Sequence, residues 1–445
     1  MRLLTGKELD GILVASVWGT LTRSSRCRPY QMRRSELVSA KDTVGIHPEA
    51  ELLLSCAHMR LDAQSAARIH TLLRADLDWS SLVEGALWHG VMPLLYRSVH
   101  TIGTDTVPLA VVERLQDYCA VNVRRNLFLT GELLKLLHLL EAQGIPALPY
   151  KGPVLAAAVY GNLALRQFGD LDILVPRQAV LHARALLLDQ GYQSPIPMTR
   201  AQEAAHLRSW YNFHLVRRDM GLLVELHWGI TPRMGAFPLD FAALWHRRQY
   251  VAIAGTTVAH FHPVDVLLLL CVHGAKDGWR RLIWLCDIAE LLRVHPELEW
   301  AQVLEQARAL RSTRRLWLGL GLAQELLGTA LPTAVVHRMH ADPVLPSLVA
   351  QVQAGLFRVT ASRRNHAFAL RVRECWQDRV GYFLYYAYQK MTPNAKDRAF
   401  LPVPAGLSFL SYLCRPVRVG REYGLRVLGL LKYFWQDVLS PTVWP

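Results

Sequence analysis

The stretch Arg166-Gln-Phe-Gly-Asp-Leu-Asp-Ile-Leu-Val175 is the most informative part of this chain, because it puts two carboxylates at the start of an apolar strand. Successive side chains of a strand point to opposite faces, so Asp170 and Asp172 are predicted to share one face. Adjacent carboxylates repel each other, and a cation between them lets both stay ionised. Hard oxygen ligands of this kind suit Mg²⁺ or Mn²⁺. The stretch therefore predicts a metal site on a strand.

Further strands are predicted on both sides of this one. Upstream, a short strand over residues 145–150 leads into the turn Lys151-Gly152-Pro153. Downstream, residues 212–218 and 222–228 alternate between apolar and polar side chains and are separated by a short turn that contains glycine. This pattern is typical of a β-hairpin. It places a third carboxylate, Glu225, on a later strand.

Helical spacing of apolar residues dominates the rest of the chain. A long helix is predicted over residues 108–143 and ends at Gly144. Other helices are predicted over 49–59, 62–74, 79–88, 177–190, 263–275, 279–293, 300–327, 344–357, 372–389 and 407–439. The fold class is therefore α+β, with a small mixed sheet between helical regions. We expect a basic, poorly ordered leader over 1–45, an N-terminal helical region over 46–143, the sheet core over 144–262 and a C-terminal helical region over 263–445.

Composition limits the class of protein. With 445 residues and 51% hydrophobic residues, the chain is long enough for large buried cores. The 50 Lys and Arg residues against 36 Asp and Glu give a net charge of +14, which could attract phosphate-rich substrates, a membrane surface or nucleic acid. Nucleic acid is not favoured, because no basic run interleaved with aromatic residues marks a groove. The seven cysteines lie far apart, and no apolar run is long enough to span a bilayer. A cytoplasmic enzyme is the expectation.

The order of the motifs resembles an uncharacterised bacterial family of the nucleotidyltransferase superfamily. The resemblance is carried by Lys151-Gly152, by the strand Arg166-x-x-Gly-Asp-x-Asp172 and by Glu225-Leu-His-Trp228. Other matching pieces are Trp88-His-Gly-Val-Met-Pro-Leu-Leu-Tyr96, Val272-His-Gly-Ala-Lys-Asp-Gly-Trp279, Trp284-Leu-Cys-Asp287, Met391-Thr-Pro393 and Arg415-Pro-Val-Arg418. The resemblance covers roughly residues 48–423. It implies a nucleotidyltransferase core within the α+β fold.

The resemblance also implies a reaction and a cofactor. A nucleoside monophosphate would move from an NTP such as ATP to an acceptor, with release of pyrophosphate and with Mg²⁺ or Mn²⁺ as cofactor. Asp170 and Asp172 would hold the metal, and Glu225 would complete the metal site. His227 lies two residues further on the same strand, so it could orient the acceptor or act as a base.

The nucleotide-binding residues implied by the resemblance lie around these carboxylates. Lys151 would meet the triphosphate, and Gly152 would permit close approach of the backbone. Arg166, Gly169 and Lys276 would lie around the nucleotide. The turn Lys151-Gly152-Pro153 departs from the Gly-Ser or Gly-Gly that is usual in the superfamily. In addition, the family often has histidine at the position that Asp277 occupies here.

Several of these residues have a structural alternative. Arg166 could simply pair with a carboxylate such as Asp170. His227, beside Trp228, could be a histidine packed in the core. Lys276 could be a surface lysine whose stem covers apolar side chains.

Asp287 raises the same question, because it falls in an otherwise apolar predicted helix. An unpaired carboxylate would be costly there. Pairing with Lys276 or Arg281 is the alternative to a contact with the nucleotide.

The acceptor class and two other kinds of function stay open. Members of the resembled family often occur beside genes for peptide natural products or surface polysaccharides, which implies a small-molecule or peptide hydroxyl as acceptor. A non-catalytic nucleotide-binding module with a regulatory role is one alternative. An RNA-modifying or toxin-type transferase is the other, and the charge of +14 is the feature that motivates it.

Overall fold

The computed structural model describes residues 47–195, 198, 200–232, 237–357 and 366–391. The expected leader over 1–45, the predicted helix over 407–439 and the motif Arg415-Pro-Val-Arg418 lie outside the described residues.

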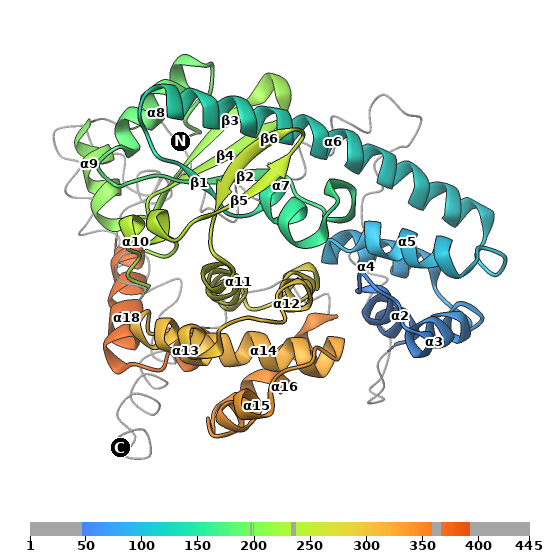
Figure 1. Cartoon of the computed structure of the whole chain (residues 1–445). Helices are drawn as coiled ribbons and strands as arrows, with labels where there is room; N and C mark the ends of the chain where they lie inside the picture. Colours follow the sequence, from blue (N-terminus) through green and yellow to red (C-terminus); the bar gives the residue numbers. More distant parts are fainter. Residues whose placement is uncertain (1–46, 196–197, 199, 233–236, 358–365, 392–445) are drawn as a thin grey trace, which may run out of the picture.

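A four-stranded mixed sheet forms the centre of the fold (Figure 1). Its strands are β1 (Leu148–Pro149), β2 (Asp170–Leu174), β3 (Asn212–Arg217) and β4 (Leu222–His227). They lie in the order β1-β2-β4-β3, and only the central pair β2 and β4 is parallel. The predicted α+β class with a small mixed sheet is confirmed.

The predicted hairpin is confirmed as the antiparallel pair β3 and β4. A 3₁₀ turn over Arg218–Met220 joins the strands, and Gly221 follows it with φ +57°. That backbone angle is one that glycine adopts without steric strain. The first strand is shorter than the predicted 145–150, because only Leu148–Pro149 pairs with β2.

Helices cover the sheet on both sides (Figure 1). The long helix α6 (Leu109–Ala142) packs against β2 and against α8 (Val180–Asp189). The turn after β1 leads directly into α7 (Gly152–Leu155) and a π-helical continuation, η1 (Ala156–Tyr160). In Figure 1, α11 (Pro263–Asp277) lies below the sheet.

The remaining elements are mostly helical. The N-terminal helices are α2 (Pro48–Cys56), α3 (Ala63–Leu73), α4 (Trp79–His89) and α5 (Met92–Ile102). Within and after the sheet region lie η2 (Leu163–Leu165), α9 (Arg200–Ser209) and α10 (Phe241–His246). The C-terminal helices are α12 (Ile283–Val294), α13 (Trp300–Ala309), α14 (Thr313–Leu327), α15 (Thr333–His340), α16 (Leu345–Leu356), α17 (His366–Arg371) and α18 (Trp376–Met391).

One of the predicted helices was wrong. The single helix expected over 300–327 is two helices, because Arg311 has φ +50° and ends α13 before α14 begins. A second hairpin, β5 (Gln249–Ile253) with β6 (Thr256–His260), was not predicted. Its turn is Ala254-Gly255, with φ +49° and +80°, and this local geometry is the kind that closes two-residue hairpins.

The buried apolar residues form two clusters. One surrounds the sheet with side chains of α6 and α8, for example Leu133, Leu171 and Val224. The other runs through the helices, for example Leu94, Leu268 and Leu320, so the N-terminal and C-terminal helical regions share one core. No helix among the described residues is long and apolar enough to cross a membrane. Both apolar clusters include strand residues, so packed helices hold the sheet on both sides.

Candidate functional site

The two central strands bring a carboxylate from each to the same place. In the parallel pairing of β2 with β4, Asp172 lies opposite Glu225. His227 is two residues beyond Glu225 and shares its face. Its Nε2 atom lies 2.9 Å from Asp172 Oδ1 and 3.1 Å from Glu225 Oε2. Two carboxylates and one imidazole thus converge on the middle of the sheet.

These three side chains could hold a metal ion. One ligand atom from each of Asp172, Glu225 and His227 lies within 4.8 Å of the others. Among the described residues, no other group of His, Cys, Asp and Glu side chains converges in this way. Two carboxylate oxygens and one imidazole nitrogen are a donor set that fits a divalent cation.

Tyr150 and Lys151, directly after β1, contact the same group of side chains. The Tyr150 hydroxyl donates to Asp172 Oδ1 at 3.3 Å and lies 3.1 Å from His227 Nε2. The Lys151 ammonium lies 3.4 Å from Asp172 Oδ2. Each oxygen of Asp172 therefore has its own partners, and Oδ1 is the one that faces the histidine.

Asn212 and His214 hold Glu225 from the neighbouring strand β3. Asn212 Nδ2 donates to Glu225 Oε2 at 2.8 Å, and His214 Nε2 lies 3.3 Å from Oε1. His214 is directly opposite Glu225 in the hairpin register. The sequence analysis missed both residues. The alternation of the predicted hairpin could have found them, because residues 212 and 214 share a face with 225.

The surroundings keep both carboxylates ionised. Burial alone would raise the pKa of Asp172, but the Lys151 ammonium and the hydrogen bond with His227 lower it to about 2. Burial also opposes the ionisation of Glu225, yet hydrogen bonds with His214 and His227 hold its pKa well below the usual range. Burial would lower the pKa of His227, but its hydrogen bonds with both carboxylates raise that pKa above its ordinary value. The two ionised carboxylates therefore favour a positive group between them.

The Lys151-Gly152 turn lies against the beginning of β2. Gly152 has φ +56°, and a Cβ atom placed on it would lie 3.3 Å from the backbone oxygen of Asp170. Asp170 is half-buried at the first position of β2 and pairs with Leu223. In the described part of the chain, it is not among the residues whose ligand atoms converge within 4.8 Å. A Cβ atom on Gly169 would meet no atom within 4 Å.

Arg166 forms an ion pair with Asp287. Its Nε and Nη2 atoms donate to the two carboxylate oxygens of Asp287 on α12, each at 2.8 Å. The Tyr160 hydroxyl donates to the same carboxylate at 2.8 Å. Both members of the ion pair are buried. Asp287 is thus paired with Arg166, a partner that the sequence analysis did not name for it.

The C-terminal end of α11 lies near the carboxylates. The Lys276 ammonium lies 5.4 Å from the centre of the Tyr211 ring, and its charge interacts with Glu225 and Asp172. His273 is on the same side of the helix. Burial, followed by the charges of Lys151 and Lys276, holds the pKa of His273 well below its usual range. His273 and Lys276 therefore lie close enough to the candidate site to interact with its charges.

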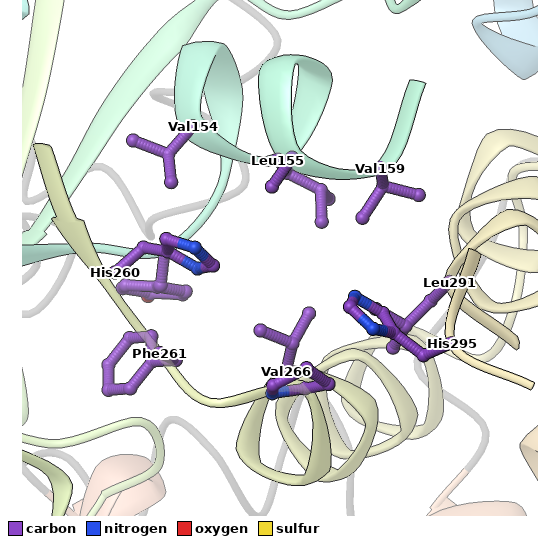
Figure 2. A pocket seen from close by; sticks show the side chains of 11 residues that line it. Val154, Leu155, Val159, His260, Phe261, Val266, Leu291 and His295 are labelled. Carbon is purple, nitrogen blue, oxygen red and sulfur yellow. The ribbon is translucent and has the colours of Figure 1, made fainter. Parts of the chain in front are cut away.

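Tyr150, which contacts Asp172 and His227, also lines a small pocket. Figure 2 shows side chains of α7, η1, α11 and α12 around it, together with His260 at the end of β6 and Phe261 directly after it. Its lining is mostly apolar, for example Leu155, Val159 and Val266. Burial lowers the pKa of His260 to about 4, so that histidine is neutral. An apolar lining of this kind does not suit a triphosphate.

Comparison with known proteins gives one match. A family model described as an uncharacterised nucleotidyltransferase matches residues 75–328, which is more than half of the chain. No curated protein and no solved structure matches. The matched range contains Lys151, Asp172, Glu225, His227 and the end of α11.

Proposed function

Because the chain belongs to the uncharacterised nucleotidyltransferase family, we propose that it transfers a nucleoside monophosphate from an NTP to a small-molecule or peptide hydroxyl. The acceptor oxygen forms a bond to the α-phosphorus, and the bond between the α-phosphorus and the bridging oxygen to the β-phosphorus breaks. Pyrophosphate leaves, and the acceptor proton passes to a base or to solvent. The alternative acceptor, RNA, has only the net charge of +14 in its favour.

The observation that carries this proposal is the pairing of Asp172 with Glu225 across two parallel strands, with His227 between their carboxylates. Nucleotidyl transfer passes through a transition state rich in negative charge, so the protein must supply positive charge at a fixed place. A divalent cation held by these side chains would supply that charge. Asp170, as the first residue of β2, is proposed to contact the same cation or a second one.

Other residues are proposed to bind the nucleotide. Lys151 already lies beside Asp172 Oδ2, and its ammonium would meet the triphosphate. Gly152 and Gly169 leave the backbone open to close approach. Lys276 would approach from α11. Arg166 is not proposed as a nucleotide contact, since it is buried and the guanidinium edge formed by Nε and Nη2 faces Asp287.

The test is transfer of label from each α-³²P NTP with Mg²⁺ or Mn²⁺. The acceptors are water and a panel of hydroxyl compounds: glycerol, glucose and peptides that contain serine, threonine or tyrosine. Asp172→Asn should abolish the release of pyrophosphate. Asp219→Asn is the matched control, because Asp219 lies on the turn of the same sheet and its side chain is 65% exposed. Nucleotide binding without release of pyrophosphate from any NTP would favour the regulatory module instead.

A further inference from the structure

We propose that His227 is itself a metal ligand, through Nε2, and that it makes the site prefer a first-row transition cation such as Mn²⁺ to Mg²⁺. The inference rests on the proposed metal site. In addition to that site, we assign His227 the role of a metal ligand and the site a preference for Mn²⁺. Metal binding can be measured without nucleotide, so the inference can fail while the proposed function stands.

The spacing of the three atoms carries the first step. In an octahedral site with bonds of about 2.1 Å, neighbouring ligand atoms lie about 3.0 Å apart. His227 Nε2 lies 2.9 Å from Asp172 Oδ1 and 3.1 Å from Glu225 Oε2. His227 Nε2 can therefore occupy a position next to the oxygen of either carboxylate around one ion, without moving the strands that carry them.

The other ring nitrogen of His227 supports this orientation. Nδ1 lies 3.3 Å from the backbone oxygen of Gly229. A hydrogen on Nδ1 that donates to this carbonyl leaves the lone pair of Nε2 directed at the carboxylates. Histidines that bind metals are held in this way, by a hydrogen bond from the nitrogen that does not contact the ion.

The burial of the ligands supports the metal preference. Imidazole is a common ligand of transition cations, whereas Mg²⁺ favours oxygen and keeps several of its waters. His227 is only 2% exposed and Asp172 only 4%, so the inner side of the site has little room for water. Glu225 is more exposed, which leaves its side open to a substrate. A mixed nitrogen and oxygen site of this kind suits Mn²⁺ better than Mg²⁺.

A ligand role changes the chemistry expected of His227. A nitrogen whose lone pair binds an ion cannot take the proton of an acceptor. His227 is then not the base of the reaction. The proton must leave through another group or through water at the open side of the site.

The experiment uses the full-length protein, stripped of metal with a chelator and loaded with Mn²⁺ alone. Electron spin echo spectroscopy of protein labelled with ¹⁵N-histidine reads directly whether a histidine nitrogen is bound to the ion. Wild-type protein should show the nitrogen coupling, and His227→Asn should lose it and bind Mn²⁺ at least about tenfold more weakly. The matched control is His214→Asn, because His214 contacts the same Glu225 but lies outside the converging group. It should keep the coupling.

Three results would overturn the inference: Mn²⁺ bound to the wild type without nitrogen coupling, coupling that persists in His227→Asn, or equal affinity of the wild type for Mg²⁺ and Mn²⁺. The first and third need no variant, so they decide the question even if His227→Asn does not fold. Release of pyrophosphate with Mg²⁺ alongside any of these results would leave the proposed function intact.

Discussion

Arg166 and Asp287 form a buried, two-point ion pair that ties the loop before β2 to helix α12. Each of the two hydrogen bonds is 2.8 Å long, and Tyr160 donates a third to the carboxylate. Because Asp170 follows Arg166 by four residues, the pair fixes the position from which β2 starts. The placement of the Asp170 and Asp172 carboxylates depends on where β2 starts.

Replacing Asp287 by alanine should therefore destabilise the protein. The Arg166 guanidinium would stay buried without a partner, at a cost of about 3–5 kcal/mol. The double variant Arg166→Met with Asp287→Leu should recover much of this loss, since it leaves no buried charge. Urea unfolding measures both effects. This prediction would be contradicted if Asp287→Ala kept the wild-type free energy of unfolding but lost nucleotide binding. The ion pair would then contribute to nucleotide binding and not to stability.

Gly152 should not tolerate a side chain. Alanine there would have φ +56° and a Cβ atom 3.3 Å from the Asp170 carbonyl, so the change should cost about 1–2 kcal/mol and should displace the turn that carries Lys151. Gly169→Ala is the control, because its Cβ would meet no atom within 4 Å. Thermal unfolding of the two variants provides the comparison. Equal melting temperatures would argue against the close packing of the turn on β2.

Lys151→Met should weaken the binding of an NTP. The Lys151 ammonium lies 3.4 Å from Asp172 Oδ2, beside the proposed metal site that the triphosphate would contact. Lys135→Met is the matched control, because Lys135 lies on α6 and its side chain is 73% exposed. Titration with a non-hydrolysable NTP analogue measures the affinities. If both variants bound the NTP analogue with the same affinity, Lys151 would not be a nucleotide-binding residue.

His89 should make the fold sensitive to mild acid. Burial, with the charge of Arg281, lowers its pKa from 6.5 to about 4. Between these two values the unfolded chain binds a proton that the folded chain does not. Stability should therefore fall as the pH falls from about 6.5 towards 4, by at most on the order of 3 kcal/mol from this residue.

The control is His89→Asn, which keeps an acceptor for the Leu282 backbone N–H that now donates to His89 Nδ1. Unfolding free energies at pH 7 and pH 5 should differ less in this variant than in the wild type. An unchanged difference would show that another group causes the acid sensitivity.

Local patterns in the sequence were enough to predict the parts of the site that lie on one strand or one turn. The alternation at residues 170–174 and 222–227 defines the faces of β2 and β4, and these strands are present. Helix starts are equally local, since Asp62 and Asp78 accept hydrogen bonds from the backbone of the first turns of α3 and α4. Strand faces and helix caps depend on residues that are neighbours in the chain, so they can be predicted from the sequence.

Pairings between distant segments could not be predicted in the same way. Arg166 and Asp287 were each recognised as charges in need of a partner, but they lie 121 residues apart and only the tertiary fold brings them together. Similarly, the parallel register of β2 with β4 decides that Asp172, and not Asp170, lies opposite Glu225. One residue of shift along a strand would have exchanged the faces.

The release of pyrophosphate by Glu225→Gln, compared with the wild type and Asp219→Asn, tests the central claim most directly. Glutamine keeps the size of the side chain and can still accept hydrogen bonds, but it lacks the charge that would hold a cation opposite Asp172. We predict that Asp219→Asn releases pyrophosphate at the wild-type rate and that Glu225→Gln is slower by about a hundredfold or more. Equal rates in all three proteins would contradict the assignment of this site.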